Sequence, residues 1–409
     1  MKTDALYLLK GGFWLSLGQI VSSLAGLISA YFFANFLSKE IYGTYTYCIS
    51  IIGILSITAL QGLSVTLIQT TASGKDGFFL PATKERAKWA LIGGFISLGM
   101  AVYYFTKHDQ ILGLACLLIS FFIPIFDPLN SYGAFVNGKK DYKTVAIFNA
   151  TTRFGPMIFI VAALFIFPNN LVAILLAYLL SHTGFRALLF FITWKKYHPA
   201  EVKDPVAMNF GRHLSFIGAL GMIAAEIDKV LVFQFLGPAQ LSIYSFASLP
   251  ISQLKKPTSI IGTLTLPKMS QRNSEELKKS IPRKMLIYFL FLLPLAIIYV
   301  LIAPWTYKIF FPQYMEAVVY SQVFAISILL VPVTLINQAL VSQLDKKGLY
   351  ITKLAFPAIK IILLLLLLPR FHLWGVITAS ILADLGLFII SYVVFKNLKT
   401  TYEEGPKTT

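Results

Sequence analysis

Long apolar stretches, separated by short polar or basic connections, run through the sequence from end to end. A helix of about 20 apolar residues crosses the roughly 30 Å hydrocarbon core of a bilayer. Lipid offers no partner to exposed backbone N–H and C=O groups, so stretches of this kind must form helices. We therefore predict twelve spanning helices near residues 11–37, 45–69, 87–106, 110–136, 144–167, 170–194, 213–236, 239–266, 285–309, 315–343, 350–369 and 374–395.

Composition supports the same class of protein. Of 409 residues, 57% are hydrophobic and only 13% are charged. Soluble proteins are nearer about 45–50% apolar and about 25% charged, so this chain has more apolar surface than soluble cores could bury. We expect an all-α integral membrane protein.

The basic residues predict the orientation of the spans. Of the 35 Lys and Arg residues, 25 fall at the termini or in every second connection, and Arg86 is counted among these. The opposite connections hold only Lys39, Lys107, Lys308 and Arg370. Because basic residues gather on the cytoplasmic side, both termini are predicted to be cytoplasmic. The net charge of +17 is then a membrane signature that attracts anionic lipid headgroups, and no nucleic-acid partner is expected.

The two halves of the sequence resemble each other. Residues 11–45 and 210–244 align at a fixed offset of 199, with eight identical pairs from Gly12/Gly211 to Tyr45/Tyr244. GKKDYK (138–143) and DKKGLY (345–350) align at an offset of 207. An even number of spans in each half gives parallel repeats. We predict six-helix bundles in residues 1–200 and 201–409, pseudo-symmetric around a central cleft, which is an alternating-access architecture.

Three segments carry a resemblance to a known family: KGGFWLSLGQIVSSLAGLISAYFFANFLSKEIYGTYTY near the start, QGLSVTLIQTTA (61–72) and EIDKVLVFQFLGPAQLSIYSFA (226–247). They resemble the Wzx-type polysaccharide flippases of the multidrug/oligosaccharidyl-lipid/polysaccharide (MOP) exporter superfamily. The resemblance implies translocation of an undecaprenyl-diphosphate-linked oligosaccharide, O-antigen or a related repeat unit, across the bacterial inner membrane, with ion coupling. It also implies a polysaccharide polymerase or assembly complex as a partner. A drug or cation antiporter of the same superfamily is the alternative interpretation.

Ionisable residues within the predicted spans are the candidate functional groups. Each costs about 2.5–3.5 kcal/mol at the bilayer centre unless it faces a partner or a water-filled cavity. We assign the basic members to binding of the diphosphate and glycan in the cleft: Arg153, Arg186, Lys255, Lys256 and Lys360. We assign a second group to ion coupling or gating: Asp127, Glu226, Asp228, Lys229 and Asp384.

Arg153 and Lys360 are the most informative pair, because they too differ by 207 positions. Each lies about 14–15 Å deep in its span at 1.5 Å per residue. If both helices line the cleft, the two cations face each other and bind phosphate oxygens. The alternative for each is a buried ion pair or a side chain that reaches toward the membrane surface.

The stretch AAEIDKVLVFQF (224–235) places three charges in one span of the second half. Glu226 and Lys229 are i,i+3 neighbours and can pair, whereas Asp228 points about 200° away from Glu226. The aligned residues of the first half are uncharged. We expect Asp228 or Glu226 to bind a proton or Na⁺, with a static interhelical salt bridge as the alternative.

The remaining in-span charges allow two interpretations each. Lys255 and Lys256 are adjacent, so only one is expected to point inward. Arg186 either lines the cleft or reaches the cytoplasmic surface. Asp127 is followed by Pro128, which predicts a kinked polar segment. Asp384 faces the interior of the second bundle or pairs with a base such as Lys360.

Catalysis receives no support from the sequence. The outward-facing connections have about eight residues or fewer, which leaves no room for the external active-site loop of a glycan polymerase or ligase. GAFVNGKK (133–140) imitates a phosphate-binding loop, but it lacks the final Ser or Thr and no strand precedes it. Asn149-Ala150-Thr151 imitates a glycosylation acceptor but lies within a span. We expect no catalytic residue, no metal and no cofactor.

Overall fold

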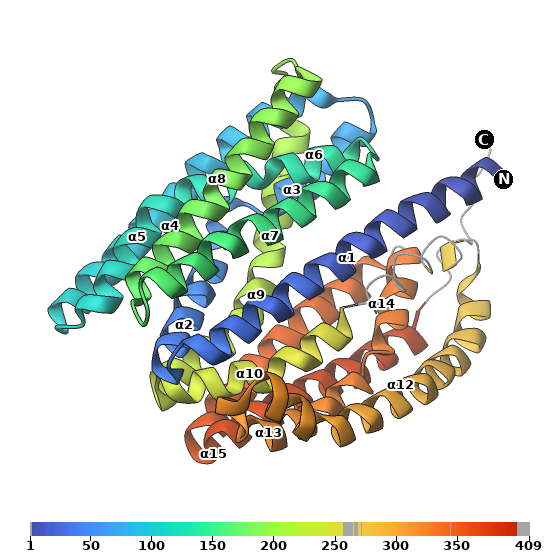
Figure 1. Ribbon diagram of the computed structural model, residues 1–409. Helices are drawn as coiled ribbons and strands as arrows, with labels where there is room; N and C mark the ends of the chain where they lie inside the picture. The colour runs from blue at the N-terminus through green and yellow to red at the C-terminus, as the bar shows by residue number, and fades with distance from the viewer. Residues whose placement is uncertain (1, 257–264, 266–268, 271, 344, 399–409) are drawn as a thin grey trace, which may run out of the picture. The chain divides into compact units, whose positions relative to one another are not determined.

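The computed structural model describes residues 2–256, 265, 269–270, 272–343 and 345–398, with the side chains of 2–13, 15–16 and 346 left aside. Every regular element in these ranges is a helix (Figure 1). The predicted all-α membrane fold is therefore confirmed.

Contacts divide the chain into two compact units. Unit 1, Met1–Phe233, contains eight α-helices and most of a ninth. Their bounds are α1 (Lys2–Phe36), α2 (Lys39–Leu55), α3 (Gly62–Ala72), α4 (Phe79–Thr106), α5 (Gln110–Phe126), α6 (Ser131–Gly138), α7 (Tyr142–Ile166), α8 (Leu171–Tyr197) and α9 (Pro205–Leu236). The predicted division at residues 200 and 201 stays a prediction.

Unit 2, Gln234–Thr409, contains α10 (Pro238–Lys255), α12 (Ser274–Phe310), α13 (Ala317–Phe324), α14 (Val333–Ser342) and α15 (Lys346–Lys396). Helix α15 reverses direction at His372, where φ is 51° and ψ is −130°. A Cβ on Gly386 would come within 3.4 Å of Ile359, and one on Gly348 within 2.6 Å of Val394. These contacts join residues on opposite sides of the reversal, so α15 consists of two antiparallel helices, as the predicted spans 350–369 and 374–395 require.

Nine helices in the described part of the chain are long and apolar enough to cross a membrane, with α15 counted once. The protein is thus a multi-pass membrane protein. Helices α9 and α10, with 32 and 18 residues, are not among the nine. The count of twelve spans rests on them and on the division of α15, and it stays a prediction.

Helix starts follow from short polar residues in the sequence. Side chains of Ser, Asp or Asn accept a hydrogen bond from a first-turn N–H at Ser38, Asp109, Asp141, Asn170, Asn273 and Asp345. Each satisfies a donor that the helix itself leaves free. These residues fix where the spanning segments begin.

Two predicted spans of unit 1 are broken helices. Between α2 and α3 lies the 3₁₀ turn η1 (Ser56–Ala59), followed by Leu60 in the left-handed region at φ 49°. Between α5 and α6 lies η3 (Pro128–Asn130), directly after Asp127. Proline has no N–H to continue a helix, so the kink predicted at Asp127 is confirmed. Both breaks expose backbone carbonyls to side-chain donors.

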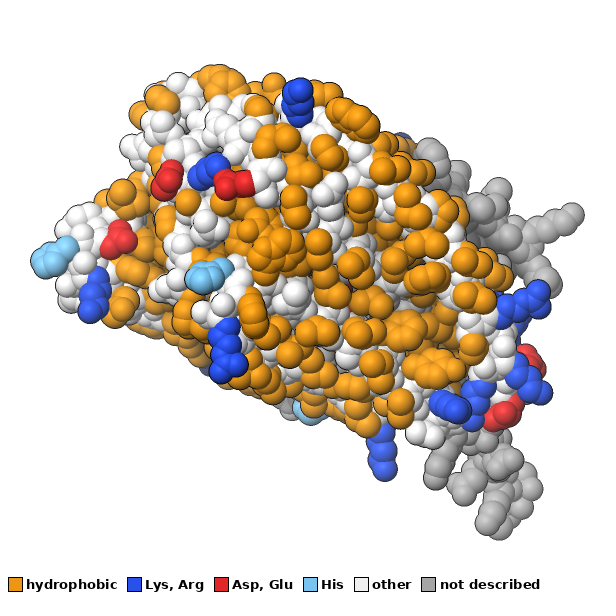
Figure 2. Space-filling model, turned by 90° about the horizontal axis from the view of Figure 1, so that it is seen from below, with side chains coloured by type: hydrophobic (Ala, Val, Ile, Leu, Met, Phe, Trp, Pro, Cys, Tyr) orange, Lys and Arg blue, Asp and Glu red, His pale blue; other side chains and the backbone are white. Residues whose placement is uncertain are grey.

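The surface of the helices is apolar, as contact with lipid requires. Phe95, Phe121 and Phe291 are each about 70% exposed (70%, 68% and 71%). Figure 2 shows hydrophobic side chains over most of one face, with few charged groups among them. Inside unit 1, side chains of α3, α4, α6 and α8 form a packed core that includes Leu63 and Phe135. This core holds the broken helices in place.

Candidate functional site

Arg153 and Arg186 lie on helices α7 and α8, which pack side by side in unit 1. The side chain of Arg153 is exposed, and it makes no ion pair or hydrogen bond with any residue that the structure describes. The side chain of Arg186 is 17% exposed. The two predicted cations of the first half therefore come from neighbouring helices.

Arg186 is held by the break between α5 and α6. Its Nη1 donates to the carbonyl oxygen of Phe126 at 2.8 Å and to Asp127 Oδ1 at 3.4 Å. The guanidinium lies 3.8 Å from the centroid of the Phe126 ring. Asp127 itself is buried. Of the two interpretations of Arg186, the structure favours an inward side chain, and it joins this residue to the predicted gating group Asp127.

Aromatic rings surround this pair. Tyr178, His182 and Arg186 recur every four residues and so share one face of α8. The ring centroids of Tyr178 and His182 are 4.4 Å apart. Tyr178 also interacts electrostatically with the charges of Arg186, Arg153, Asp127 and Glu226. The result is a polar, aromatic cluster with two guanidinium groups and one closely paired carboxylate.

Arg86 is a buried arginine whose structural role sequence reasoning missed. Its assignment to a cytoplasmic connection is wrong, because Arg86 lies within helix α4 and is 1% exposed. It donates to the Ala59 carbonyl at 2.9 Å, to Ser131 Oγ at 3.0 Å and to Gln61 Oε1 at 3.1 Å. A signal was present: Ala82, Arg86 and Ala90 recur every four residues, which is the spacing of a buried helix face.

The Arg86 side chain ties the two breaks together. Ala59 and Gln61 belong to the break between α2 and α3, and Ser131 begins α6. Ser131 Oγ also donates to the Pro128 carbonyl at 2.7 Å. Arg86 is therefore a positioning residue for the segment that carries Asp127.

The charges of α9 behave as the spacing predicts. Lys229 Nζ and Glu226 Oε2 form a salt bridge of 2.7 Å. Asp228 is buried on another side of the helix, and its Oδ1 accepts a hydrogen bond from the Lys229 N–H at 3.0 Å. Glu226 rests on α2, because a Cβ on Gly53 would lie 3.0 Å from its Cγ. Whether these groups bind an ion stays a prediction.

Unit 2 holds the other predicted bases. Lys255 Nζ lies 3.2 Å from Asp384 Oδ2, so Lys255 is the base that pairs with this acid. Lys256 follows α10 directly, and Lys360 is buried with 8% of its surface exposed. The predicted approach of Lys360 to Arg153 joins the two units and stays a prediction.

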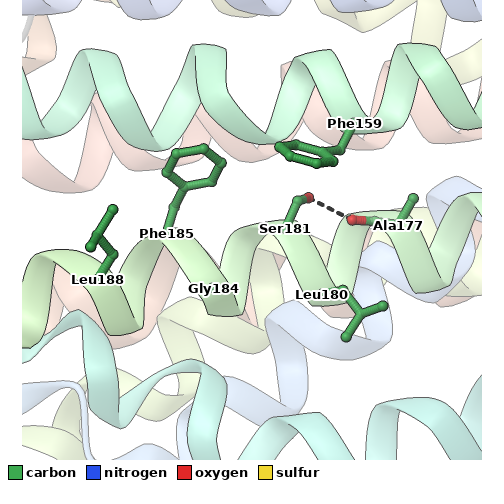
Figure 3. A pocket seen from close by; sticks show the side chains of 7 residues that line it. All are labelled: Phe159, Ala177, Leu180, Ser181, Gly184, Phe185 and Leu188. Carbon is green, nitrogen blue, oxygen red and sulfur yellow. Dashed lines mark hydrogen bonds between the residues drawn. The ribbon is translucent and has the colours of Figure 1, made fainter.

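An apolar groove of about 460 Å³ lies between α7 and α8 (Figure 3). Phe159 and Phe185 flank it, and Gly184 and Ser181 form part of its floor. Phe185 also packs directly on Gly155 of α7. None of the residues that line this groove is charged, so the groove offers no cation to bind a phosphate headgroup.

The described residues contain no group of three or more His, Cys, Asp or Glu side chains arranged to hold a metal ion. The cluster in unit 1 contains two guanidinium groups, the rings of Tyr178 and His182, and the Asp127 carboxylate, and the charge of Glu226 also acts on Tyr178. Guanidinium forks match phosphate and carboxylate oxygens. The cluster is suited to binding an anion.

Comparison with known proteins identifies the family. Residues 8–273 match the family described as polysaccharide biosynthesis protein. A candidate O-antigen transporter of Shigella flexneri is 22% identical over 330 residues, which cover 75% of this chain and 77% of that protein.

Solved structures show the fold. The lipid II flippase MurJ in an inward closed conformation has a TM-score of 0.67 at 14% identity, over 93% of this chain and 87% of that chain. The MATE multidrug transporter DinF-BH, solved as a complex, has a TM-score of 0.69 at 12% identity, over 98% of this chain and 97% of that chain. These matches point to a transporter family rather than an enzyme. The sequence resemblance agrees with these matches: the chain belongs to the polysaccharide biosynthesis protein family, and it has the fold of the MurJ and MATE structures.

Proposed function

We propose that the protein moves an undecaprenyl-diphosphate-linked oligosaccharide, an O-antigen or related repeat unit, from the inner to the outer leaflet of a bacterial inner membrane. Family membership and the transporter fold support this proposal. Alternating access of two bundles, with both termini in the cytoplasm, is part of it. A polysaccharide polymerase or assembly complex is the proposed partner that consumes the product.

One observation carries the proposal: the exposed Arg153 lies in the spanning helix α7, which packs against the helix of Arg186, and it has no anionic partner among the described residues. A cation at this depth is expensive unless water or an anionic ligand meets it. A diphosphate has enough charged oxygens to engage two guanidinium forks at once. Its headgroup would bind here, and its lipid tail would remain in the bilayer.

The alternative, a drug or cation antiporter, needs acidic groups that are available to a cation. Three of the four predicted acids already have basic partners, since Glu226 pairs with Lys229, Asp384 with Lys255 and Asp127 with Arg186. These pairs favour an anionic substrate. For ion coupling we retain Asp228, and Asp228→Asn is expected to abolish coupled transport while the protein still reaches the membrane.

The test is complementation of a strain that lacks this gene, with surface polysaccharide measured by immunoblot at matched protein levels. Arg153→Gln should abolish the polymer, and the double change with Lys360→Gln should be no better. Arg153→Lys should retain part of the activity, because it keeps the charge and loses the fork. Lys195→Gln, an exposed base at the end of α8, is the matched control. Full polymer from the double variant would overturn the proposal, and drug efflux in the same strain would then test the antiporter.

A further inference from the structure

A second pocket in unit 1, of about 260 Å³, lies between α3, α6 and α7. Its lining contains no charged residue. The polar and aromatic members are Ser64, Asn130, Asn137, Asn149, Tyr132 and Phe148. The rings of Tyr132 and Phe148 are 5.6 Å apart and nearly perpendicular. The pocket is thus neutral, rich in amides and walled by aromatic rings.

Helical spacing brings the amides together. Asn130 is the N-cap residue of α6, Asn137 lies seven residues or about two turns further along, and Asn149 follows Phe148 on α7. Gly133, on the same face of α6, leaves space open, because a Cβ there would meet nothing within 4 Å. Residues of α3, of α6 with its N-cap, and of α7 therefore line the pocket.

Among the residues that the structure describes, the three amide side chains have no hydrogen-bond partner. Asn130 occupies the N-cap position of α6 but makes no side-chain capping bond. Neither it nor Asn137 nor Asn149 donates or accepts a side-chain hydrogen bond with any residue in the described ranges. All three lie in segments long and apolar enough to span the membrane. Asn130 and Asn149 are exposed and Asn137 is partly buried, so the three amides are available to a ligand that enters the pocket.

The chemistry of the pocket selects a class of ligand. Each amide offers two N–H donors and one carbonyl acceptor, which match neighbouring hydroxyl or acetamido groups. Aromatic rings pack well against the C–H faces of a ring compound. The absence of charged lining residues disfavours a phosphate. A sugar ring satisfies all three conditions.

The pocket lies next to the cationic cluster. Asn149 and Arg153 are four residues apart on α7, about 6 Å along the helix axis and on the same face. Tyr132, which lines the pocket, interacts electrostatically with the charges of Arg153 and Arg186. A neutral sugar pocket and an anion site thus stand one helical turn apart.

We infer that this pocket binds the sugar residue joined to the diphosphate of the lipid-linked substrate, and that its amides select which sugar is carried. The inference rests on the proposed function. It assigns glycan recognition to Asn130, Asn137 and Asn149, and charge recognition to the two arginines.

The test measures binding to the purified full chain in detergent, with two probes. One is undecaprenyl diphosphate, which has no sugar. The other is the lipid-linked oligosaccharide extracted from the deletion strain. The Asn137→Ala/Asn149→Ala double variant should bind the second probe about ten-fold more weakly or worse, and the first probe as the unchanged protein does. Arg153→Gln should weaken both. Asn35→Ala, an asparagine of α1 outside the pocket, is the matched control.

The outcomes separate the two ideas. If the Asn variants bind both probes normally while Arg153→Gln weakens both, the sugar pocket is overturned and the proposed function stands. Equal loss of both probes in the Asn variants also overturns the pocket, and a melting curve of each variant then identifies misfolding. Asn137→Ser, which is smaller and keeps a hydroxyl, should lie between the unchanged protein and Ala. If neither probe binds to the unchanged protein, the proposed function itself fails.

Discussion

Replacing Arg86 by Met tests whether one side chain holds the two broken helices of unit 1. Methionine keeps much of the length of arginine and removes the charge and all five donors. The change leaves the Ala59 carbonyl, the Gln61 amide oxygen and the Ser131 hydroxyl without the donors seen at 2.9–3.1 Å. The protein should become less stable, and the segment around Asp127 should lose its fixed position.

The magnitude follows from opposing contributions. A hydrogen bond to a charged group contributes about 1.5–3 kcal/mol, so three of them contribute about 4.5–9 kcal/mol. Removal of the buried cation also relieves a desolvation penalty of several kcal/mol. We expect a net loss of about 3 kcal/mol in the free energy of unfolding. At about 2–4 °C per kcal/mol for a cooperative unit of this size, the midpoint should fall by about 6–12 °C.

Fluorescence-monitored thermal unfolding in one detergent, at one scan rate, measures the midpoint. Lys88→Met is the matched control, because Lys88 is exposed on the same helix two residues away and loses the same charge. It should leave the midpoint unchanged. If Arg86→Met unfolds at the same temperature as this control, the three bonds contribute nothing net, and the reasoning about the breaks is refuted.

Three further changes test the packing and the caps. Gly62→Ala should prevent stable folding of unit 1, since its Cβ would overlap the backbone nitrogen of Ser215, whereas Gly99→Ala, with open space around it, should be neutral or slightly stabilising; expression and midpoint distinguish them. Asp141→Ala should cost about 1 kcal/mol, because it removes the cap of α7 and the ion pair of 3.4 Å with Lys196; thermal unfolding measures this. Burial alone would raise the pKa of Asp141, but hydrogen bonds from the Thr144 hydroxyl and N–H and from Lys196 lower it overall. A lowered pKa means that this contribution is complete above about pH 5 and is lost as the pH falls below about 4; the difference in midpoint between the unchanged protein and Asp141→Ala should shrink over that window.

The sequence predicted the class and most helices because apolar length is a strong, local signal. It also predicted the Glu226–Lys229 pair, because i,i+3 spacing fixes both side chains on one helix. The reversal at His372 agrees with two separately predicted spans. In each of these cases the structure-determining interaction lies within a few residues along the chain.

What the sequence could not predict depends on contacts between distant segments. In the sequence, Arg86 resembles the other bases of a cytoplasmic loop. Its burial depends on hydrogen bonds to Ala59 and Ser131, which are distant in the sequence. The partner of Arg186 lies 59 residues away at Asp127. The amides of the proposed sugar pocket come from α6 with its N-cap and from α7, so the approach of Asn149 to the other two depends on helix packing.

Arg186 already holds an anion of its own. Its guanidinium contacts Asp127, while Arg153 is open. Under the proposed function, a diphosphate that reaches both arginines competes with the Asp127 carboxylate for Nη1 of Arg186, so loading the site includes an exchange of counter-ions. Exchange weakens net affinity, because the new ion contact forms only as another is lost. Under the same proposal, the Asp127 carboxylate can return to Arg186 when the headgroup leaves, so that release needs no anion from solution.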